Sequence, residues 1–148
     1  MVNIRTLKKE DIKKIVYLEE TFLGETLGEE MLESELDSKV TKFYVATINE
    51  EVVGYIGRYE LLNEAEVLNF VVDEAYQRQG IGQMLFNKVE EDLPNLEKMT
   101  LEVRESNTKA KNFYTKNGFK QISIRKNYYK NNENALVLIK EYLWEYYQ

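Results

Sequence analysis

A strand that runs into a glycine loop and then a helix is the feature that most constrains the fold of this chain. The strand predicted over Glu66–Val72 ends in the apolar run Phe70-Val71-Val72, which is typical of a central strand covered on both faces. The loop Gln77–Gly82 follows, and a helix is predicted over Gly82–Leu93. A sheet with helices on both faces is therefore expected.

The remaining elements are predicted from hydrophobic periodicity and turn residues. Helices are expected over Lys9–Phe22, Glu29–Asp37 and from Ser106 or Asn107 to Asn117, with Gly118 as a left-handed cap. Further strands are expected over Val2–Arg5, Lys42–Ile48, Val52–Glu60, Met99–Arg104, Phe119–Lys126 and Ala135–Lys140. The order β-α-α-β-β-β-α-β-α-β-β predicts an α/β (α+β) fold with a mixed, mostly antiparallel sheet. Without a Pro/Gly/Ser-rich linker, the 148 residues are expected to form a single domain, 1–148.

Composition excludes several kinds of chemistry. The chain has no histidine and no cysteine, so imidazole bases, thiolate nucleophiles and the usual zinc sites are excluded, and no metal is expected. With 26 acids against 20 bases, the net charge is −6, which disfavours direct nucleic-acid binding and suits a basic partner. Neither a spanning apolar segment nor a signal-peptide pattern is visible, so a cytoplasmic protein with no membrane association is expected.

The charges around the glycine loop indicate an anion site. Between Gln77 and Lys88 there are two cations and no acid, whereas three acids, Glu90, Glu91 and Asp92, lie at the far end of the helix. This is the reverse of what a helix dipole favours, and the helix has no capping side chain at its start. A bound phosphate would supply both the missing cap and the negative charge at the start of the helix. The alternative is a simple connecting turn. A dinucleotide fingerprint would need glycine at Leu85, and no Gly-Lys-Ser/Thr P-loop is present.

Three motifs carry a family resemblance. Gln77-x-x-Gly80-x-Gly82 resembles the coenzyme A loop of the GNAT acetyltransferases. Leu101–Asn107, followed by Asn112-Phe113-Tyr114 and Asn117-Gly118-Phe119, resembles the later motif of that superfamily. With Ile124–Tyr129, the chain is similar to the ribosomal-protein-alanine N-acetyltransferases, which modify the N-terminal amine of a small-subunit ribosomal protein.

The resemblance implies a GNAT-like sheet, acetyl-CoA as co-substrate and a role for each matching residue. Backbone groups at Phe70, Val71 and Val72 would hold the acetyl and pantetheine arm, and Asn107 would contact the coenzyme. The pyrophosphate would lie on the amides of Gln77, Arg78, Gln79, Gly80, Ile81 and Gly82. Glu102 would act as general base, and Tyr114 would protonate the departing thiolate. Where many members carry a Pro-Trp pair, this chain has Leu23-Gly24-Glu25-Thr26, in a loop that helps to shape the acceptor site.

Each catalytic role has a structural alternative. Glu102 alternates with Leu101 and Val103 on its strand, so from spacing alone it could be a solvated residue paired with Arg104. Tyr114 shares a helical stripe with Phe113, which suits a core aromatic, although a packed tyrosine can still present its hydroxyl.

Charge is segregated along the chain. Eight acids, with no cation among them, form what we call the acidic run: Glu19, Glu20, Glu25, Glu29, Glu30, Glu33, Glu35 and Asp37. Seven cations lie between Lys109 and Lys130 without an acid. These sets could be two solvated faces, or an acidic rim that attracts a basic peptide and a basic side near the phosphates. Tyr128 and Tyr129 would flank the peptide N-terminus.

The leading hypothesis is an N-terminal acetyltransferase acting on a basic ribosomal protein. The alternatives are an acetyltransferase of a polyamine or another amine, and a non-catalytic acyl-CoA-binding or ribosome-associated module. A monomer or homodimer is expected. The aromatic tail over Lys140–Gln148 includes the single tryptophan, Trp144, and is expected to dock on its own domain or on a second copy.

Overall fold

The computed structural model describes residues 1–142, which form seven strands, four α-helices and three shorter helical turns. The strands are β1 (Val2–Thr6), β2 (Thr41–Ile48), β3 (Glu51–Leu61), β4 (Glu64–Val72), β5 (Lys98–Arg104), β6 (Lys120–Arg125) and β7 (Ala135–Glu141). The α-helices are α1 (Ile12–Leu18), α2 (Glu29–Ser34), α3 (Ile81–Asp92) and α4 (Thr108–Lys116). The order along the chain agrees with the predicted one.

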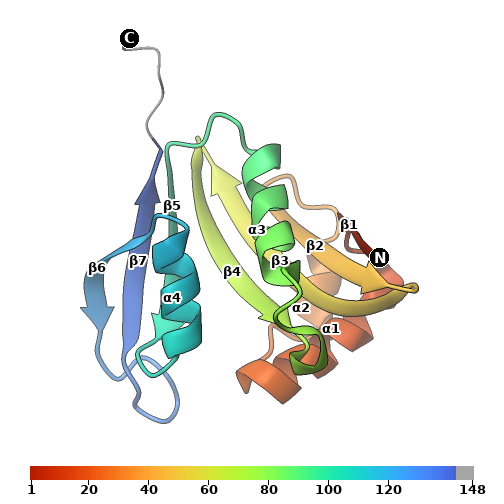
Figure 1. Ribbon diagram of the computed structural model, residues 1–148, viewed down its shortest axis with the longest axis horizontal. Helices are drawn as coiled ribbons and strands as arrows, with labels where there is room; N and C mark the ends of the chain where they lie inside the picture. The colour runs from red at the N-terminus through yellow and green to blue at the C-terminus, as the bar shows by residue number, and fades with distance from the viewer. Residues whose placement is uncertain (143–148) are drawn as a thin grey trace. The chain divides into compact units, whose positions relative to one another are not determined.

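The sheet has the strand order β1-β2-β3-β4-β5-β7-β6 (Figure 1). Its ladders β1–β2, β2–β3, β5–β7 and β6–β7 are antiparallel, whereas β4 and β5 are parallel. The predicted mixed, mostly antiparallel sheet is confirmed. The parallel ladder joins only Glu64–Glu66 to Lys98–Thr100, although β4 continues to Val72.

The described residues group into two compact units. Unit 1 comprises residues 1–60 and 68–94, and unit 2 comprises residues 61–67 and the chain from Asn95 onwards. The first part of β4 therefore belongs to unit 2, where it pairs with β5, and the rest belongs to unit 1.

Within unit 1, helices cover both faces of the sheet. Phe43 and Val45 of β2 belong to one buried core with Ile15 and Leu18 of α1 and with Leu32 of α2. Tyr44, between them, points to the opposite face, where its hydroxyl donates to Asp92 of α3 at 2.6 Å. Because alternate residues of a strand face opposite sides, α3 and the α1–α2 pair lie on different faces (Figure 1).

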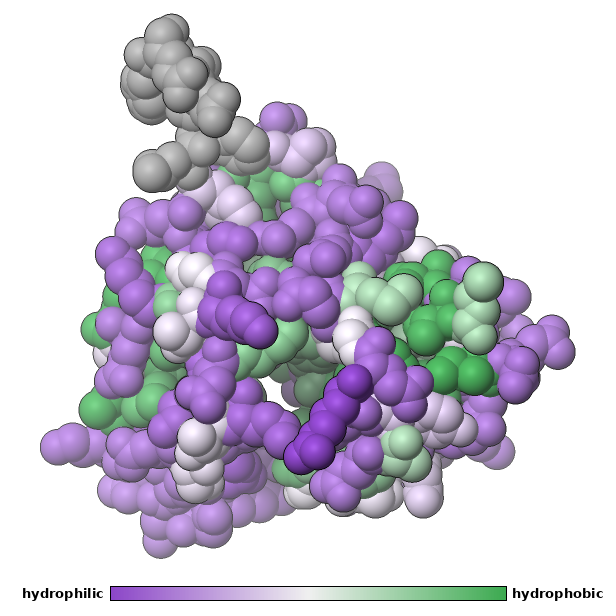
Figure 2. Space-filling model, in the orientation of Figure 1, coloured by the Kyte–Doolittle hydropathy of each residue, from purple (hydrophilic) through white to green (hydrophobic). Residues whose placement is uncertain are grey.

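Unit 2 is built on the alternation of β5. Met99, Leu101 and Val103 are buried, whereas Thr100 and Glu102 between them are partly exposed, as predicted. Beyond β7 lies the edge strand β6, whose residues are all exposed, Ile122 and Ile124 included. Figure 2 shows hydrophobic surface along the left margin, where β6 lies.

Element bounds differ most before α2. The single helix predicted over Lys9–Phe22 is a 3-10 turn at Lys9–Asp11, then α1, then a π-helix at Glu19–Leu23 that ends at the left-handed Gly24. The predicted helix over Glu29–Asp37 stops at Ser34. Hydrophobic spacing does not distinguish α, 3-10 and π turns over so few residues.

Candidate active site

The glycine loop lies between β4 and α3 in unit 1. Helix α3 begins at Ile81, and its N-cap, Gly80, is left-handed with φ 78° and provides no side-chain cap. The expectation of an uncapped helix start is therefore confirmed. Arg78 also has a positive φ, of 69°. The Gln77 side chain donates to the Val72 carbonyl at 3.2 Å, which ties the loop to the end of β4.

The two glycines differ in the space around them. A Cβ built on Gly80 would meet nothing within 4 Å, so that position is open. A Cβ on Gly82 would lie 3.6 Å from the Phe70 ring and 3.8 Å from the Val72 side chain. The first amides of a helix have no intrahelical acceptor, and here no side chain caps them. The structure thus brings Phe70, Val72 and Gly82 together beside amides that suit an anion.

The inverted charges of α3 have a partly local explanation. Asp92, at the end of the helix, accepts a hydrogen bond from Tyr44 and forms an ion pair with Lys88 at 3.6 Å. Burial and this hydrogen bond raise the pKa of Tyr44 to about 12, so the tyrosine remains the donor. One of the three acids is therefore placed by a structural contact, and the open helix start is the stronger indication of a phosphate site.

Glu102 projects from β5 into a group of polar side chains in unit 2. Its Oε2 atom lies 2.8 Å from Nε of Arg125, and its Oε1 accepts from the Tyr128 hydroxyl at 3.2 Å. The side chain is 22% exposed, although its Oε2 atom is buried and accepts no hydrogen bond from residues 1–142. The negative charge of Glu102 raises the pKa of Tyr128, which therefore donates rather than ionises.

The suggested pairing of Glu102 with Arg104 is wrong. Arg104 forms an ion pair with Glu133 at 3.2 Å, and its guanidinium lies 3.9 Å from the centre of the Tyr129 ring. Glu133 also accepts from the Ser106 amide, and these hydrogen bonds lower its pKa to about 2. Spacing along β5 could not reveal Arg125, because that residue comes from β6, two strands away in the sheet.

Tyr114 is a buried aromatic residue. It is 7% exposed and packs edge to face against Phe113 and Phe119, with ring centres 5.4 and 5.3 Å away. Burial raises its pKa, so the phenol keeps its proton. The structural alternative for Tyr114 therefore holds, and its role as an acid stays a prediction.

Asn107 forms the N-cap of α4, and its side-chain oxygen accepts from the Ala110 amide at 3.1 Å. Because the oxygen of this exposed side chain caps the helix, a coenzyme would contact the other atoms of the side chain. The part of Asn107 in coenzyme binding stays a prediction.

Glu25 lies exposed in the loop between the π-helix and α2, but Glu19 does not share its environment. The prediction that Glu19 belongs to a solvated acidic rim is wrong, because Glu19 is fully buried and accepts several hydrogen bonds. The sequence contained a signal for this, since Glu19 follows Ile12 and Ile15 by seven and four residues on the apolar stripe of the helix.

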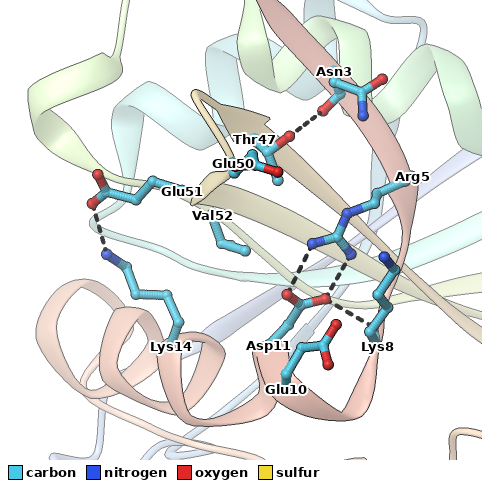
Figure 3. A pocket seen from close by; sticks show the side chains of 10 residues that line it. All are labelled: Asn3, Arg5, Lys8, Glu10, Asp11, Lys14, Thr47, Glu50, Glu51 and Val52. Carbon is cyan, nitrogen blue, oxygen red and sulfur yellow. Dashed lines mark hydrogen bonds and ion pairs between the residues drawn. The ribbon is translucent and has the colours of Figure 1, made fainter.

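A surface pocket elsewhere in unit 1 contains none of the predicted site residues (Figure 3). Seven of its ten lining residues are charged, and four of these seven form two ion pairs. Arg5 binds Asp11 at 2.7 Å and Lys14 binds Glu51 at 3.2 Å. Burial alone would raise the pKa of Asp11, but the hydrogen bonds from Arg5 and the Lys8 amide lower it. Among residues 1–142 there is no cluster of acids that could hold a metal, and no helix long and apolar enough to cross a membrane.

Comparison with known proteins identifies the family. The model of the acetyltransferase (GNAT) domain matches residues 3–135. The chain belongs to the GNAT acetyltransferases. This GNAT chain is 32% identical to an N-alpha-acetyltransferase of Sulfurisphaera tokodaii, over 91% of its own length and 90% of the relative. It is 37% identical to the [ribosomal protein bS18]-alanine N-acetyltransferase of Haemophilus ducreyi, over 62% of this chain and 68% of that one.

Solved GNAT structures agree with the fold. The ribosomal-protein-S18-alanine N-acetyltransferase from Escherichia coli matches with a TM-score of 0.87 and 27% identity, covering 99% of this chain and 98% of that one. Ard1 from Thermoplasma volcanium matches with a TM-score of 0.88 and 30% identity, covering 97% of this chain and 99% of that one. The protein is thus a GNAT N-acetyltransferase, and acetyl-CoA is its acetyl donor.

Proposed function

We propose that this enzyme acetylates the N-terminal α-amine of a basic protein in the cytoplasm, most specifically a small-subunit ribosomal protein that begins with alanine. The observation that carries the chemistry is the Glu102 carboxylate, half-buried and held by Arg125 and Tyr128. Support for the acceptor comes from the relatives named for alanine N-acetylation of ribosomal protein bS18.

The basicity of the acceptor favours an α-amine. An α-amino group has a pKa near 7.7–8.0, against about 10.4 for lysine, so an appreciable fraction is already neutral near pH 7. A carboxylate can take the remaining proton directly or through one water molecule. Oε1 of Glu102, which accepts from Tyr128, keeps a lone pair for such a contact, whereas Oε2 is buried beside Arg125. Glu102 would therefore orient the amine and accept its proton.

The acetyl donor would lie along β4 and the glycine loop. Phe70, Val71 and Val72 would hold its acetyl and pantetheine arm through the backbone, and the amides of residues 77–82 would bind the pyrophosphate. The open space at Gly80 and the uncapped start of α3 support this placement. Tyr114, which burial keeps protonated, would supply a proton to the leaving sulfur.

Incubation with acetyl-CoA and a basic peptide that begins with alanine tests the proposal. We expect one acetyl group on the α-amine, located by mass spectrometry. The matched control is the same peptide with a blocked N-terminus and its lysines intact. Acetylation of that control, or of a polyamine but not of the free peptide, would contradict the proposal and favour a different amine acceptor.

A further inference from the structure

A buried carboxylate in unit 1 joins the loop before α2 to the sheet. The two oxygens of Glu19 have different partners. Oε1 accepts from the Thr26 hydroxyl at 2.7 Å and from the Leu27 amide at 3.2 Å. Oε2 accepts from the Tyr55 hydroxyl at 2.5 Å and from the Asn69 amide group at 2.7 Å. One oxygen therefore holds the loop, and the other holds β3 and β4.

Such a group is costly unless it is fully hydrogen-bonded. Glu19 is 0% exposed, and removing a carboxylate from water is unfavourable without compensating contacts. A carboxylate has about four acceptor positions, and the four donors from Thr26, Leu27, Tyr55 and Asn69 use that capacity. Glutamine would not be an equivalent replacement for Glu19, because the glutamine NH2 group would face hydrogen-bond donors.

The segment held in this way is bounded by two hinge-like residues. Gly24 and Gly28 both have positive φ, of 73° and 89°, and the segment between them is Glu25-Thr26-Leu27. Thr26 also accepts from the Gly28 amide at 2.9 Å, and Leu27 packs against the core. Glu19 itself opens a π-helix, a conformation that is frequent at functional sites. We call Gly24–Gly28 the acceptor loop.

We infer that Glu19 is a positioning residue, which fixes the acceptor loop against β4 so that Glu25 meets the incoming amine substrate in one orientation. The inference rests on the proposed function, because it assumes that this loop faces the acceptor. Asn69 immediately precedes Phe70 in the strand that would carry the acetyl arm. The Glu19 carboxylate would thus fix the position of the acceptor loop relative to β4, the strand that would carry the acetyl arm.

Variants of Thr26 test the loop side while leaving Glu19 in place. Thr26→Val keeps the volume but removes the hydroxyl, and Thr26→Ser keeps the hydroxyl. Because a hydrogen bond to a charged group is a strong one, we expect Thr26→Val to raise the peptide KM about tenfold. The acetyl-CoA KM should change less than twofold, and Thr26→Ser should behave like the parent enzyme. A merely structural role would lower the melting temperature and shift both KM values alike.

Hydrogen exchange tests Glu19 itself without relying on activity. In Glu19→Gln we expect faster exchange of the Leu27 amide than in the parent, whereas Glu20→Gln, at the exposed neighbouring acid, should leave it unchanged. Unchanged exchange in Glu19→Gln would show that Glu19 does not hold the loop. Faster exchange in Thr26→Val with an unchanged peptide KM would overturn positioning while leaving the proposed function intact. If the parent enzyme acetylates no α-amine, the proposed function fails, and positioning of an acceptor fails with it.

Discussion

Glu102 accepts a hydrogen bond from Tyr128 and forms an ion pair with Arg125, so its substitution separates basicity from position. Glu102→Gln keeps the shape and can still accept from Tyr128, but it cannot take a proton from the amine. General acid–base catalysis is worth about 10²–10⁴-fold, so kcat should fall within that range while acetyl-CoA binding persists. Single-turnover kinetics measure the rate of the chemical step, and calorimetry measures acetyl-CoA binding. The matched control is Glu105→Gln, at an exposed acid one residue beyond β5, and a Glu102→Gln kcat within about twofold of the parent would remove Glu102 from the mechanism.

Tyr114 should matter less than Glu102. A thiolate leaving group with a free pKa near 8.5 needs only modest help from an acid. Tyr114→Phe keeps the edge-to-face packing with Phe113 and Phe119, so its melting temperature should stay close to that of the parent. We expect a kcat reduction smaller than that of Glu102→Gln, measured in parallel. An equal or larger reduction would assign the dominant proton transfer to Tyr114.

At the scale of single residues, the sequence predicted the direction of a side chain better than the residues that it contacts. Spacing placed Glu102 opposite Leu101 and Val103, as the burial pattern of β5 confirms. It could not supply Arg125 or Tyr128, because both come from a segment that only the β5–β7–β6 pairing brings near. The burial of Glu19 could have been read from its place on the apolar stripe of the helix, but its partners Tyr55 and Asn69 lie far along the chain.

Among the elements, the glycine loop and the start of α3 carry the prediction for the donor. Gly82→Asp would place a negative charge where the phosphates should lie. An acid in the first turn of a helix is favourable, so the fold should persist. We expect acetyl-CoA affinity to fall at least about tenfold by calorimetry, with an undiminished melting temperature. Gly82→Ala adds only a Cβ in ordinary contact with Phe70 and should still bind, whereas undiminished binding by Gly82→Asp would exclude a phosphate site there.

The exposed part of the acidic run carries the prediction for the acceptor. Reversal of Glu25, Glu29 and Glu33 to lysine should raise the KM of a basic peptide several-fold, and the acetyl-CoA KM much less. The effect should shrink in added salt, because exposed charges are screened over about 8 Å at physiological ionic strength. A matched control reverses Glu64, Glu91 and Glu97, which are also exposed and include one ion-paired acid, Glu64, as Glu33 is paired with Lys9. If both triple variants change the peptide KM equally, only net charge matters.

The elements with strong local signals were the ones predicted closely. Strands were predicted over Lys42–Ile48 and Val52–Glu60, and in the structure β2 ends at Ile48, Asn49 and Glu50 turn the chain at positive φ, and β3 begins at Glu51. Gly118 has the expected left-handed conformation, with φ 98°. The short parallel ladder could not be predicted, because it depends on where two distant strands diverge rather than on either strand's own residues.

For the whole molecule, the C-terminal tail provides the stability prediction. Tyr142 donates from its amide to the Glu97 carbonyl at 2.9 Å, and the rest of the predicted docking segment, with Trp144, lies outside the described residues. Deletion of Tyr142–Gln148 should lower the melting temperature by several degrees, at roughly 3 °C for each kcal/mol lost. It should also increase binding of a hydrophobic dye. A truncated protein with the parent's melting temperature and solution size would contradict docking, and Trp144→Ala tests whether the tryptophan accounts for any loss.

The assignment of residues 61–67 to unit 2 limits how the chain can be divided. A cut between Pro94 and Asn95 leaves Glu64–Glu66 on one fragment and their partners, Lys98–Thr100, on the other. The second fragment then lacks a strand of its own sheet, and the first carries a strand segment whose partner is missing. The parallel ladder between β4 and β5 can therefore form only when both pieces are present.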